Sequence, residues 1–124
     1  MRVLLADDSD PVRSRVAALV RGVSGARVVA EAVDAPGAIA AVAAHGPDVL
    51  VLDVMMPGGG GLAVMDALGG RARRPTVIVF TNLVDDEVRA AFRARGADHF
   101  LDKSREFDRL AVLLADLAAA RGTR

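Results

Sequence analysis

Five polar residues that follow or close short apolar runs could carry out chemistry together. Asp7 and Asp8 come directly after one run, and Asp53 comes directly after another. Thr81 closes a third run, and Lys103 lies just beyond a fourth. A carboxylate nucleophile, an ammonium and a hydroxyl are groups that phosphoryl transfer uses, because this chemistry depends on positioning and on neutralising charge. The residue types therefore indicate phosphoryl transfer, provided that the fold brings them to one place.

The spacing of apolar residues predicts the elements that must position these side chains. Strands are expected at residues 3–6, 27–32, 49–52, 76–81 and 98–101, each followed by residues with helical periodicity. Four of the expected helices start at capping residues, namely Ser9, Asp34, Asp85 and Ser104. Strands that alternate with helices favour right-handed crossovers and a parallel sheet with helices on both faces. Five repeats are too few for an eight-fold barrel, so we expect an open, doubly wound α/β sheet in the order 2-1-3-4-5.

This strand order would bring the three aspartates together. Strands 1 and 3 are neighbours in it, and ligands of such sheets bind there, beyond the carboxyl ends of the strands. Asp7, Asp8 and Asp53 should then share one shallow pocket. Like charges this close need compensation, which Mg²⁺ (or Mn²⁺) supplies because it prefers oxygen ligands, a few of them carboxylates. Lys103, the single lysine among 16 basic residues, would add a mobile positive charge.

Composition and charge exclude several classes of protein. The chain has 124 residues, with 16 basic and 16 acidic side chains and no cysteine. Zero net charge argues against a nucleic-acid partner, which requires a basic excess, and the lack of cysteine excludes a disulfide framework. No apolar run approaches the roughly 20 residues of a membrane span, and Met1 and Arg2 lead directly into a strand rather than a signal peptide. We expect one cytoplasmic domain over residues 1–124, with no membrane partner.

Read in order, these motifs resemble the receiver domains of bacterial two-component response regulators over essentially the whole chain. The matching features are the pair Asp7-Asp8, Asp53 followed by Met56-Pro57 and Gly61, Thr81, and Lys103 preceded by Phe100. Residues 96–104 are especially similar to free-standing receivers. The resemblance implies a flavodoxin-like fold for residues 1–124, with no output domain. It also implies a phosphorylation-activated switch of a two-component system or phosphorelay.

The resemblance further implies a role for each acidic residue of the pocket. Asp53 would accept a phosphoryl group from a sensor histidine kinase, a histidine phosphotransfer protein or a small phosphodonor. Asp8, Asp53 and the backbone carbonyl of Met55 would bind Mg²⁺ directly, and Asp7 would bind it through water. The chain would not be a conventional turnover enzyme. At most, it would phosphorylate itself from small donors and lose the group by autodephosphorylation.

Three other residues would convert phosphorylation into a change of shape. Lys103 would pair first with Asp53 and then with the phosphoryl group, and Thr81 would swing towards the new phosphoryl oxygens. Phe100 would change rotamer to fill the space that is vacated. New charge-assisted contacts of this kind drive two-state switches. The signal would then pass to a downstream protein target by direct contact.

Three residues around the expected pocket depart from the pattern common in receivers. Asn82 stands where a small residue is usual, at the mouth of the pocket, and could gate access. Met55 and Leu83 stand where receivers often place polar side chains that orient an attacking water. We hypothesise that these two apolar residues slow the loss of the phosphoryl group.

Other interpretations of the same residues carry less weight. Residues 58–63 fit the G-x-G-x-x-A pattern of dinucleotide sites, but no acidic residue closes the next strand, so we interpret the glycines as a flexible active-site loop. An aspartate-nucleophile phosphatase would need a second aspartate two residues after Asp53, where Met55 stands. A phosphorylation-independent adaptor with the same fold should lack an essential pocket residue, and none is missing.

The last expected helix is more apolar than one buried stripe requires, since Val112 and Leu113 accompany Leu110, Leu114 and Leu117. Ordinary core packing and a partner surface explain this equally well. In receivers that resemble this chain, the face built from helix 4, strand 5 and helix 5 is the usual output or dimerisation surface. A homodimer through this face is therefore a further expectation.

Overall fold

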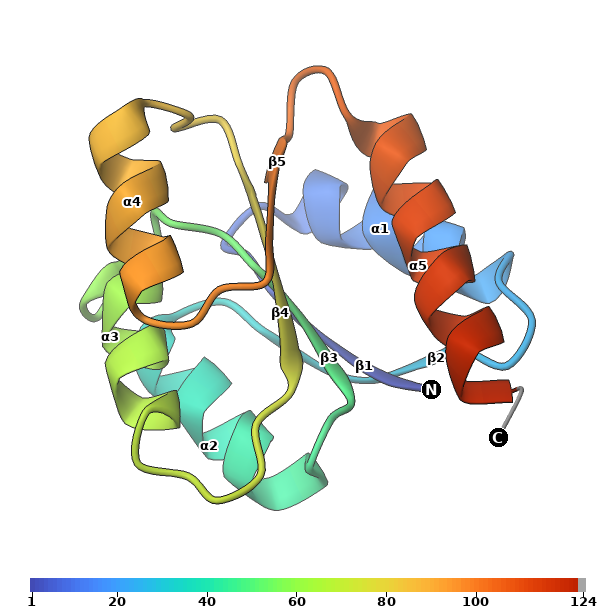
Figure 1. Ribbon diagram of the computed structural model, residues 1–124, viewed down its shortest axis with the longest axis horizontal. Coiled ribbons are helices and arrows are strands. Elements are labelled where there is room, and N and C mark those ends of the chain that lie inside the picture. The colour runs from blue at the N-terminus through green and yellow to red at the C-terminus, as the bar shows by residue number, and fades with distance from the viewer. Residues whose placement is uncertain (123–124) are drawn as a thin grey trace.

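Five parallel strands form one sheet in the order β2-β1-β3-β4-β5 within residues 1–122, the part of the chain that the computed structural model describes (Figure 1). The strands are β1 (Arg2–Ala6), β2 (Arg27–Ala32), β3 (Val49–Leu52), β4 (Thr76–Thr81) and β5 (His99–Asp102). A helix follows each strand, namely α1 (Asp10–Arg21), α2 (Ala35–His45), α3 (Gly60–Leu68), α4 (Asp86–Ala94) and α5 (Phe107–Gly122). This arrangement confirms the predicted doubly wound α/β fold, including the order of the strands.

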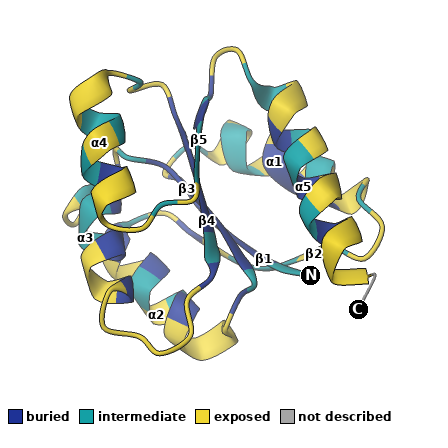
Figure 2. Cartoon of the chain, in the orientation of Figure 1, coloured by how far each residue is buried: buried dark blue, intermediate teal, exposed yellow. Residues whose placement is uncertain are grey.

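The sheet is the middle of three layers, with α1 and α5 on one face and α2, α3 and α4 on the other (Figure 1). Each face has its own apolar core, because successive side chains of a strand point to opposite faces. Leu4 and Leu50 pack on the side of α2 to α4, whereas Val3 and Val49 pack on the side of α1 and α5. β3 is buried at every position, and exposed residues lie on the outer faces of the helices (Figure 2). Within residues 1–122, no helix has the length and apolar character to cross a bilayer.

Three helices begin at the capping residues that the sequence predicts. The side chains of Ser9, Asp34 and Asp85 each accept a hydrogen bond from the backbone N–H group three residues further on. A cap of this kind stabilises a helix by about 1 kcal/mol. Each cap also lies within a few residues of the end of a strand. The helices therefore start close to the carboxyl edge of the sheet and leave short loops there.

The start of α5 differs from the prediction, which takes Ser104 as its cap. The helix begins at Phe107, and the Glu106 carbonyl accepts a hydrogen bond from the N–H of Leu110. Ser104 instead donates to the carboxylate of Asp102 through its backbone N–H and its hydroxyl, at 2.9 and 2.7 Å. These hydrogen bonds hold the pKa of Asp102 below its ordinary value. The strand before this turn also ends one residue later than predicted, because Asp102 still pairs with β4.

The glycine-rich segment after β3 packs closely against the rest of the protein. Gly58 and Gly59 have φ angles of 82° and 113°, in the left-handed region that favours glycine. A Cβ atom on Gly61 would lie 2.6 Å from the backbone oxygen of Asp53 and 3.0 Å from the ring of Phe92. Close packing within the chain therefore explains these glycines without a bound dinucleotide.

Candidate functional site

Three aspartates meet at the carboxyl edge of the sheet, as the strand order predicts. β1 pairs with β3 as far as Ala6 and Leu52, so the next residues, Asp7 and Asp53, lie beside each other. One carboxylate oxygen from each of Asp7, Asp8 and Asp53 lies within 4.8 Å of the other two. Asp7 and Asp53 are buried, whereas Asp8 is exposed. This edge of the sheet therefore carries a compact and partly buried group of negative charges.

The ammonium group of Lys103 compensates two of these charges. Its Nζ lies 2.6 Å from Asp7 Oδ2 and 2.9 Å from Asp53 Oδ2, and 8% of the residue is exposed. The backbone positions this side chain, because the N–H of Lys103 donates to the carbonyl of Thr81 at 2.9 Å, just beyond the β4–β5 ladder. Burial alone would lower the pKa of Lys103, but the hydrogen bonds and charges of Asp7 and Asp53 outweigh it and raise the pKa above its ordinary value of 10.5. The contact with Asp7 has no counterpart in the sequence-based expectations.

Lys103 should make the stability of the fold sensitive to alkaline pH. Its pKa is higher in the folded than in the unfolded state, so its ion pairs contribute fully below pH 10.5 and lose their contribution as pH rises through the folded-state pKa. The difference in unfolding free energy between the wild type and Lys103→Ala should stay constant around neutral pH and shrink above pH 10.5. Urea unfolding followed by circular dichroism measures it. The change at alkaline pH can be assigned to Lys103, because the chain has no tyrosine, no cysteine and no other lysine. A difference that shrinks already around neutral pH would contradict it.

A second cation, Arg13, holds the turn that presents Asp7 and Asp8. Its Nη1 donates to the backbone carbonyl of Asp7 at 2.7 Å, and its Nε donates to Glu31 Oε1 at 3.1 Å. It also pairs with Asp10, so one guanidinium joins the start of α1, the end of β1 and the neighbouring strand β2. Burial alone would lower the pKa of Arg13, but Asp10 and Glu31 outweigh it and raise the pKa. Arg13 is the residue of this site that the sequence reasoning missed.

The carboxylates of Asp8 and Asp53 border a pocket of about 280 Å³ at this edge of the sheet. Its lining includes most of the predicted site residues, namely Asp8, Asp53, Met55, Thr81, Asn82, Leu83 and Lys103. Thr81 is 1% exposed, and its hydroxyl accepts a hydrogen bond from the N–H of Leu83 at 3.2 Å. Met55 and Leu83 are 65% and 36% exposed, and Asn82 is exposed beside them. The buried lining of the pocket is therefore polar, and its exposed lining combines the apolar Met55 and Leu83 with the polar Asp8 and Asn82.

Phe100 does not line this pocket. Its ring packs under α4, with its centroid 6.5 Å from that of Phe92 in an edge-to-face arrangement. The guanidinium carbon of Arg89 lies 5.0 Å from the centroid of the Phe100 ring. A change in the rotamer of Phe100 would therefore alter contacts of α4 rather than contacts within the pocket.

Known proteins share both this fold and its sequence pattern. The chain matches the response regulator receiver domain family over residues 3–115. It is 36% identical over 104 residues to protein-glutamate methylesterase/protein-glutamine glutaminase 5 of Myxococcus xanthus, which covers 83% of this chain and 30% of that protein. It is 32% identical over 117 residues to the nitrate/nitrite response regulator protein NarL of Escherichia coli, which covers 94% of this chain and 54% of that protein. A two-component response regulator of the LuxR family from Aurantimonas sp. SI85-9A1 superposes with a TM-score of 0.86 at 27% identity, over 96% of this chain and 85% of that one.

The chain belongs to the response regulator receiver domain family. A receiver domain is the signalling domain of a two-component response regulator. The chain spans 30% and 54% of the length of the two curated relatives, so the methylesterase and nitrate-response activities in their names describe those whole proteins.

The donor set of the acidic pocket fits a hard divalent cation. Three carboxylate oxygens lie within 4.8 Å of one another, and one of them belongs to the exposed Asp8. Mg²⁺ is usually bound through one or two carboxylates while it keeps several waters, and a pocket of about 280 Å³ leaves room for them. The residues present are therefore suited to the metal that receiver domains bind at their acidic pocket.

Proposed function

We propose that Asp53 accepts a phosphoryl group from a sensor histidine kinase or a histidine phosphotransfer protein, with Mg²⁺ (or Mn²⁺) in the acidic pocket. The phosphorylated domain then signals in the cytoplasm by contact with a downstream protein. The observation that carries this proposal is the Lys103 ammonium between Asp7 and Asp53, next to the exposed carboxylate of Asp8. Together these groups supply a nucleophile, charge neutralisation and a metal site, which are the requirements of phosphoryl transfer.

Among the three aspartates, Asp53 is best placed to be the nucleophile. It lines the pocket, with one oxygen 2.9 Å from Lys103 Nζ and the other 3.5 Å from the N–H of Met55. Asp7 does not line this pocket, and its two carboxylate oxygens are held by Lys103 Nζ at 2.6 Å and by the N–H of Ser9 at 2.8 Å. In the transfer, an oxygen of Asp53 forms a bond to phosphorus while the bond from phosphorus to the donor's histidine nitrogen breaks. The electron pair of that bond stays with the imidazole of the donor.

The other pocket residues have roles before and after this step. Asp8, Asp53 and the backbone carbonyl of Met55 would hold Mg²⁺, and Asp7, which is already paired with Lys103, would reach it through water. When bound, Mg²⁺ supplies positive charge that offsets the carboxylates and the phosphoryl oxygens. Asn82 gates the mouth of the pocket.

Thr81, Lys103 and Phe100 form the switch in this proposal. Because the hydroxyl oxygen of Thr81 accepts from the N–H of Leu83, its O–H is left to donate to a phosphoryl oxygen. Lys103 transfers its contact from the carboxylate of Asp53 to the phosphoryl group. Phe100 then changes rotamer under α4, which carries the change to the surface.

The experiment that tests the proposal is phosphorylation from a small donor. The protein is incubated with acetyl phosphate in Mg²⁺ and, in parallel, with an excess of chelator, and the intact mass is measured. We expect a gain of one phosphoryl group in Mg²⁺ and none in the chelator. An unchanged mass in both samples would contradict the proposal, and so would an equal gain in both.

Arg13→Ala should weaken the binding of Mg²⁺ by roughly tenfold, because partners that orient metal ligands contribute about that much to affinity. The variant loses the hydrogen bond that fixes the carbonyl of Asp7. Isothermal titration calorimetry measures the affinity, and Arg13→Lys should recover part of it. The matched control is Arg21→Ala at the exposed end of the same helix, which should bind Mg²⁺ like the wild type. If Arg13→Ala and Arg21→Ala bound Mg²⁺ with equal affinity, Arg13 would have no role in positioning the metal ligands.

Replacing the apolar rim of the pocket should shorten the lifetime of the phosphoryl group. Met55 and Leu83 border the pocket with no side-chain group that could orient an attacking water. We expect Met55→Asn and Leu83→Gln each to speed the loss of phosphate. The two effects combined should amount to at least about tenfold, since a positioned polar group contributes more than this in favourable cases. The measurement is the decay of the phosphorylated mass after the donor is removed. Decay of the wild type within seconds, or equal decay of all three proteins, would contradict the hypothesis.

A further inference from the structure

Met55 presents its thioether to solvent at the acidic pocket. It is 65% exposed, and it lines the pocket beside Asp53. The other methionines differ from it in burial or in place. Met56 and Met65 are 8% and 1% exposed, and the half-buried Met1 precedes β1, at the opposite edge of the sheet. Met55 is therefore the methionine that combines high exposure with a position in the proposed site.

This thioether is also the preferred target of a peroxide. The chain has no cysteine, so no thiol competes for the oxidant. Close packing protects Met56 and Met65, which belong to the apolar core on the side of α2 to α4. Oxidation of methionine requires that the oxidant reaches the sulfur, which is open to solvent at Met55. A peroxide should therefore oxidise Met55 well before either buried methionine.

We propose that Met55 is a site of reversible oxidation by a peroxide, and that its oxidation shortens the time for which Asp53 stays phosphorylated. The sulfur lone pair attacks one peroxide oxygen, so that an S–O bond forms as the O–O bond breaks. The departing hydroxide takes the proton from the transferred oxygen and leaves as water. The sulfur is oxidised by two electrons to the sulfoxide, and the peroxide is reduced. The inference deepens the proposed function, because it rests on phosphorylation of Asp53 and names a means of regulating that site.

Oxidation would change the chemistry of the pocket lining at this position. A thioether is a weak hydrogen-bond acceptor, whereas a sulfoxide is polar and carries an oxygen that accepts readily. The new oxygen would stand on a side chain that lines the same pocket as Asp53 and Thr81. There it can accept a hydrogen bond from a water and hold that water towards the phosphorus atom. The phosphoryl group should then be lost faster, and the signal should end sooner.

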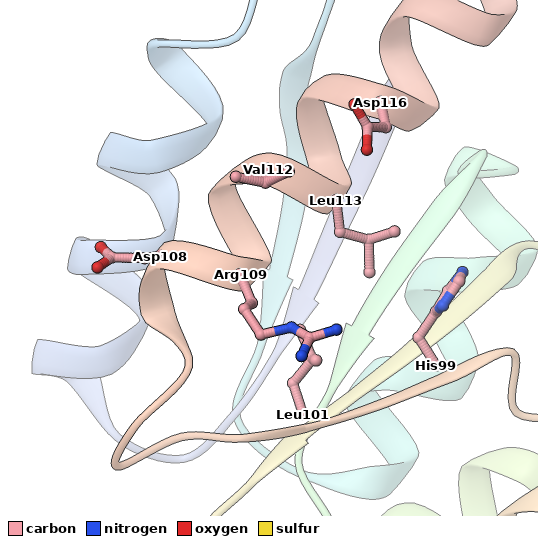
Figure 3. A pocket seen from close by; sticks show the side chains of 7 residues that line it. All are labelled: His99, Leu101, Asp108, Arg109, Val112, Leu113 and Asp116. Atoms are coloured by element: carbon pink, nitrogen blue, oxygen red, sulfur yellow. The ribbon is translucent and has the colours of Figure 1, made fainter.

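The groove between β5 and α5 would keep its chemistry under the same treatment (Figure 3). It has a volume of about 330 Å³, and Figure 3 shows Leu113 projecting into it from α5 towards β5. Val112, which also lines it, is 61% exposed. Among the described residues that border this groove, none is a methionine. Oxidation should therefore act at the acidic pocket and leave this surface unmodified.

The test begins with dilute hydrogen peroxide, which is removed before the protein is phosphorylated with acetyl phosphate in Mg²⁺. Peptide mass mapping should place the sulfoxide at Met55 and not at Met56 or Met65. Decay of the phosphorylated intact mass should be at least about tenfold faster in the oxidised than in the untreated wild type, the size of effect that a positioned polar group produces. Methionine sulfoxide reductases for both epimers, with a thiol reductant, should restore the slow decay.

Two variants control for damage elsewhere. Met55→Leu has no sulfur at this position, so its own decay should be the same before and after peroxide. The matched control Met56→Leu keeps the exposed thioether and replaces a buried one by a residue of similar volume. Its decay should respond to peroxide as the wild type does. Circular dichroism melts before and after treatment verify that each protein is folded.

Oxidation of Met56 or Met65 ahead of Met55 would overturn the proposal. So would equal or slower decay of the oxidised wild type, or an acceleration that Met55→Leu shares. The untreated wild type separates this inference from the proposed function. Phosphorylation with a lifetime that the sulfoxide does not shorten contradicts this inference alone, whereas no gain of a phosphoryl group before peroxide treatment contradicts the proposed function.

Discussion

Asp53→Asn should abolish phosphorylation, with a loss of rate of at least about 100-fold, because losing a catalytic nucleophile has effects of this size or larger. Asparagine keeps the size of the side chain, but its amide is uncharged and a poor nucleophile. The wild type should gain one phosphoryl group from acetyl phosphate in Mg²⁺, whereas the variant should keep its mass. The variant should also stay folded, because Lys103 retains its ion pair with Asp7 and because one of three crowded like charges is removed.

The matched control is Asp85→Asn at the start of α4. Asp85 is exposed and caps the helix through its side chain, and asparagine caps a helix as well as aspartate does. This variant should be phosphorylated like the wild type. Phosphorylation of Asp53→Asn at the wild-type rate would show that another residue is the acceptor.

Lys103→Ala should destabilise the fold by roughly 3 kcal/mol when Mg²⁺ is absent, the cost typical of removing one partner of a buried ion pair. The buried carboxylates of Asp7 and Asp53 would then face each other without the ammonium that lies within 3 Å of both in the wild type. Mg²⁺ should restore much of this loss, because a cation at about 100 times its dissociation constant stabilises the folded state by about 2.7 kcal/mol. Urea unfolding with Mg²⁺ and with chelator measures both effects.

The comparison with Lys103→Arg separates charge from packing. Arginine keeps the positive charge, so this variant should lose less stability than Lys103→Ala and should gain less from Mg²⁺. If Mg²⁺ stabilised the wild type and Lys103→Ala by the same amount, the metal would not be replacing the charge of the lysine. That result would show that the metal binds somewhere other than at the carboxylates that Lys103 contacts.

The fold was predictable because its determinants are local. Apolar runs such as Val49–Leu52 are buried on both faces of the sheet, and the caps Ser9, Asp34 and Asp85 start their helices where the spacing predicts. The start of α5 was not predictable from spacing alone, because Ser104 has a second partner. The carboxylate of Asp102 captures its hydroxyl, and the chain makes a further turn before Phe107.

The acidic cluster was predictable from the strand order, because residues that follow neighbouring parallel strands must lie at one edge. The cations around it were only half predictable. Lys103 follows β5 and is found in this way, but its contact with Asp7 depends on the path of a long side chain. Arg13 lies inside α1 and contacts the backbone of Asp7, so no residue pattern marks it except an arginine in the first turn after an acidic pair.

At the surface of α4 and α5, too, one feature could be predicted from the sequence and another could not. The sequence marks the last helix as unusually apolar, but it gives no sign that Arg89 is left with a buried, unpaired nitrogen over Phe100. That property arises from the packing of α4 against β5, which brings together residues 11 positions apart in the sequence. Properties that depend on such packing can be seen in the structure but not in the sequence.

The most direct test of the central claim is to locate the phosphoryl group chemically. After incubation with acetyl phosphate and Mg²⁺, the protein is treated with borohydride, which reduces an aspartyl phosphate to homoserine, and the digested peptides are sequenced by mass spectrometry. We predict homoserine at position 53 and at no other acidic residue. Homoserine at Asp7 or Asp8 instead, or none in a sample whose intact mass shows phosphorylation, would contradict the assignment of Asp53 as the acceptor.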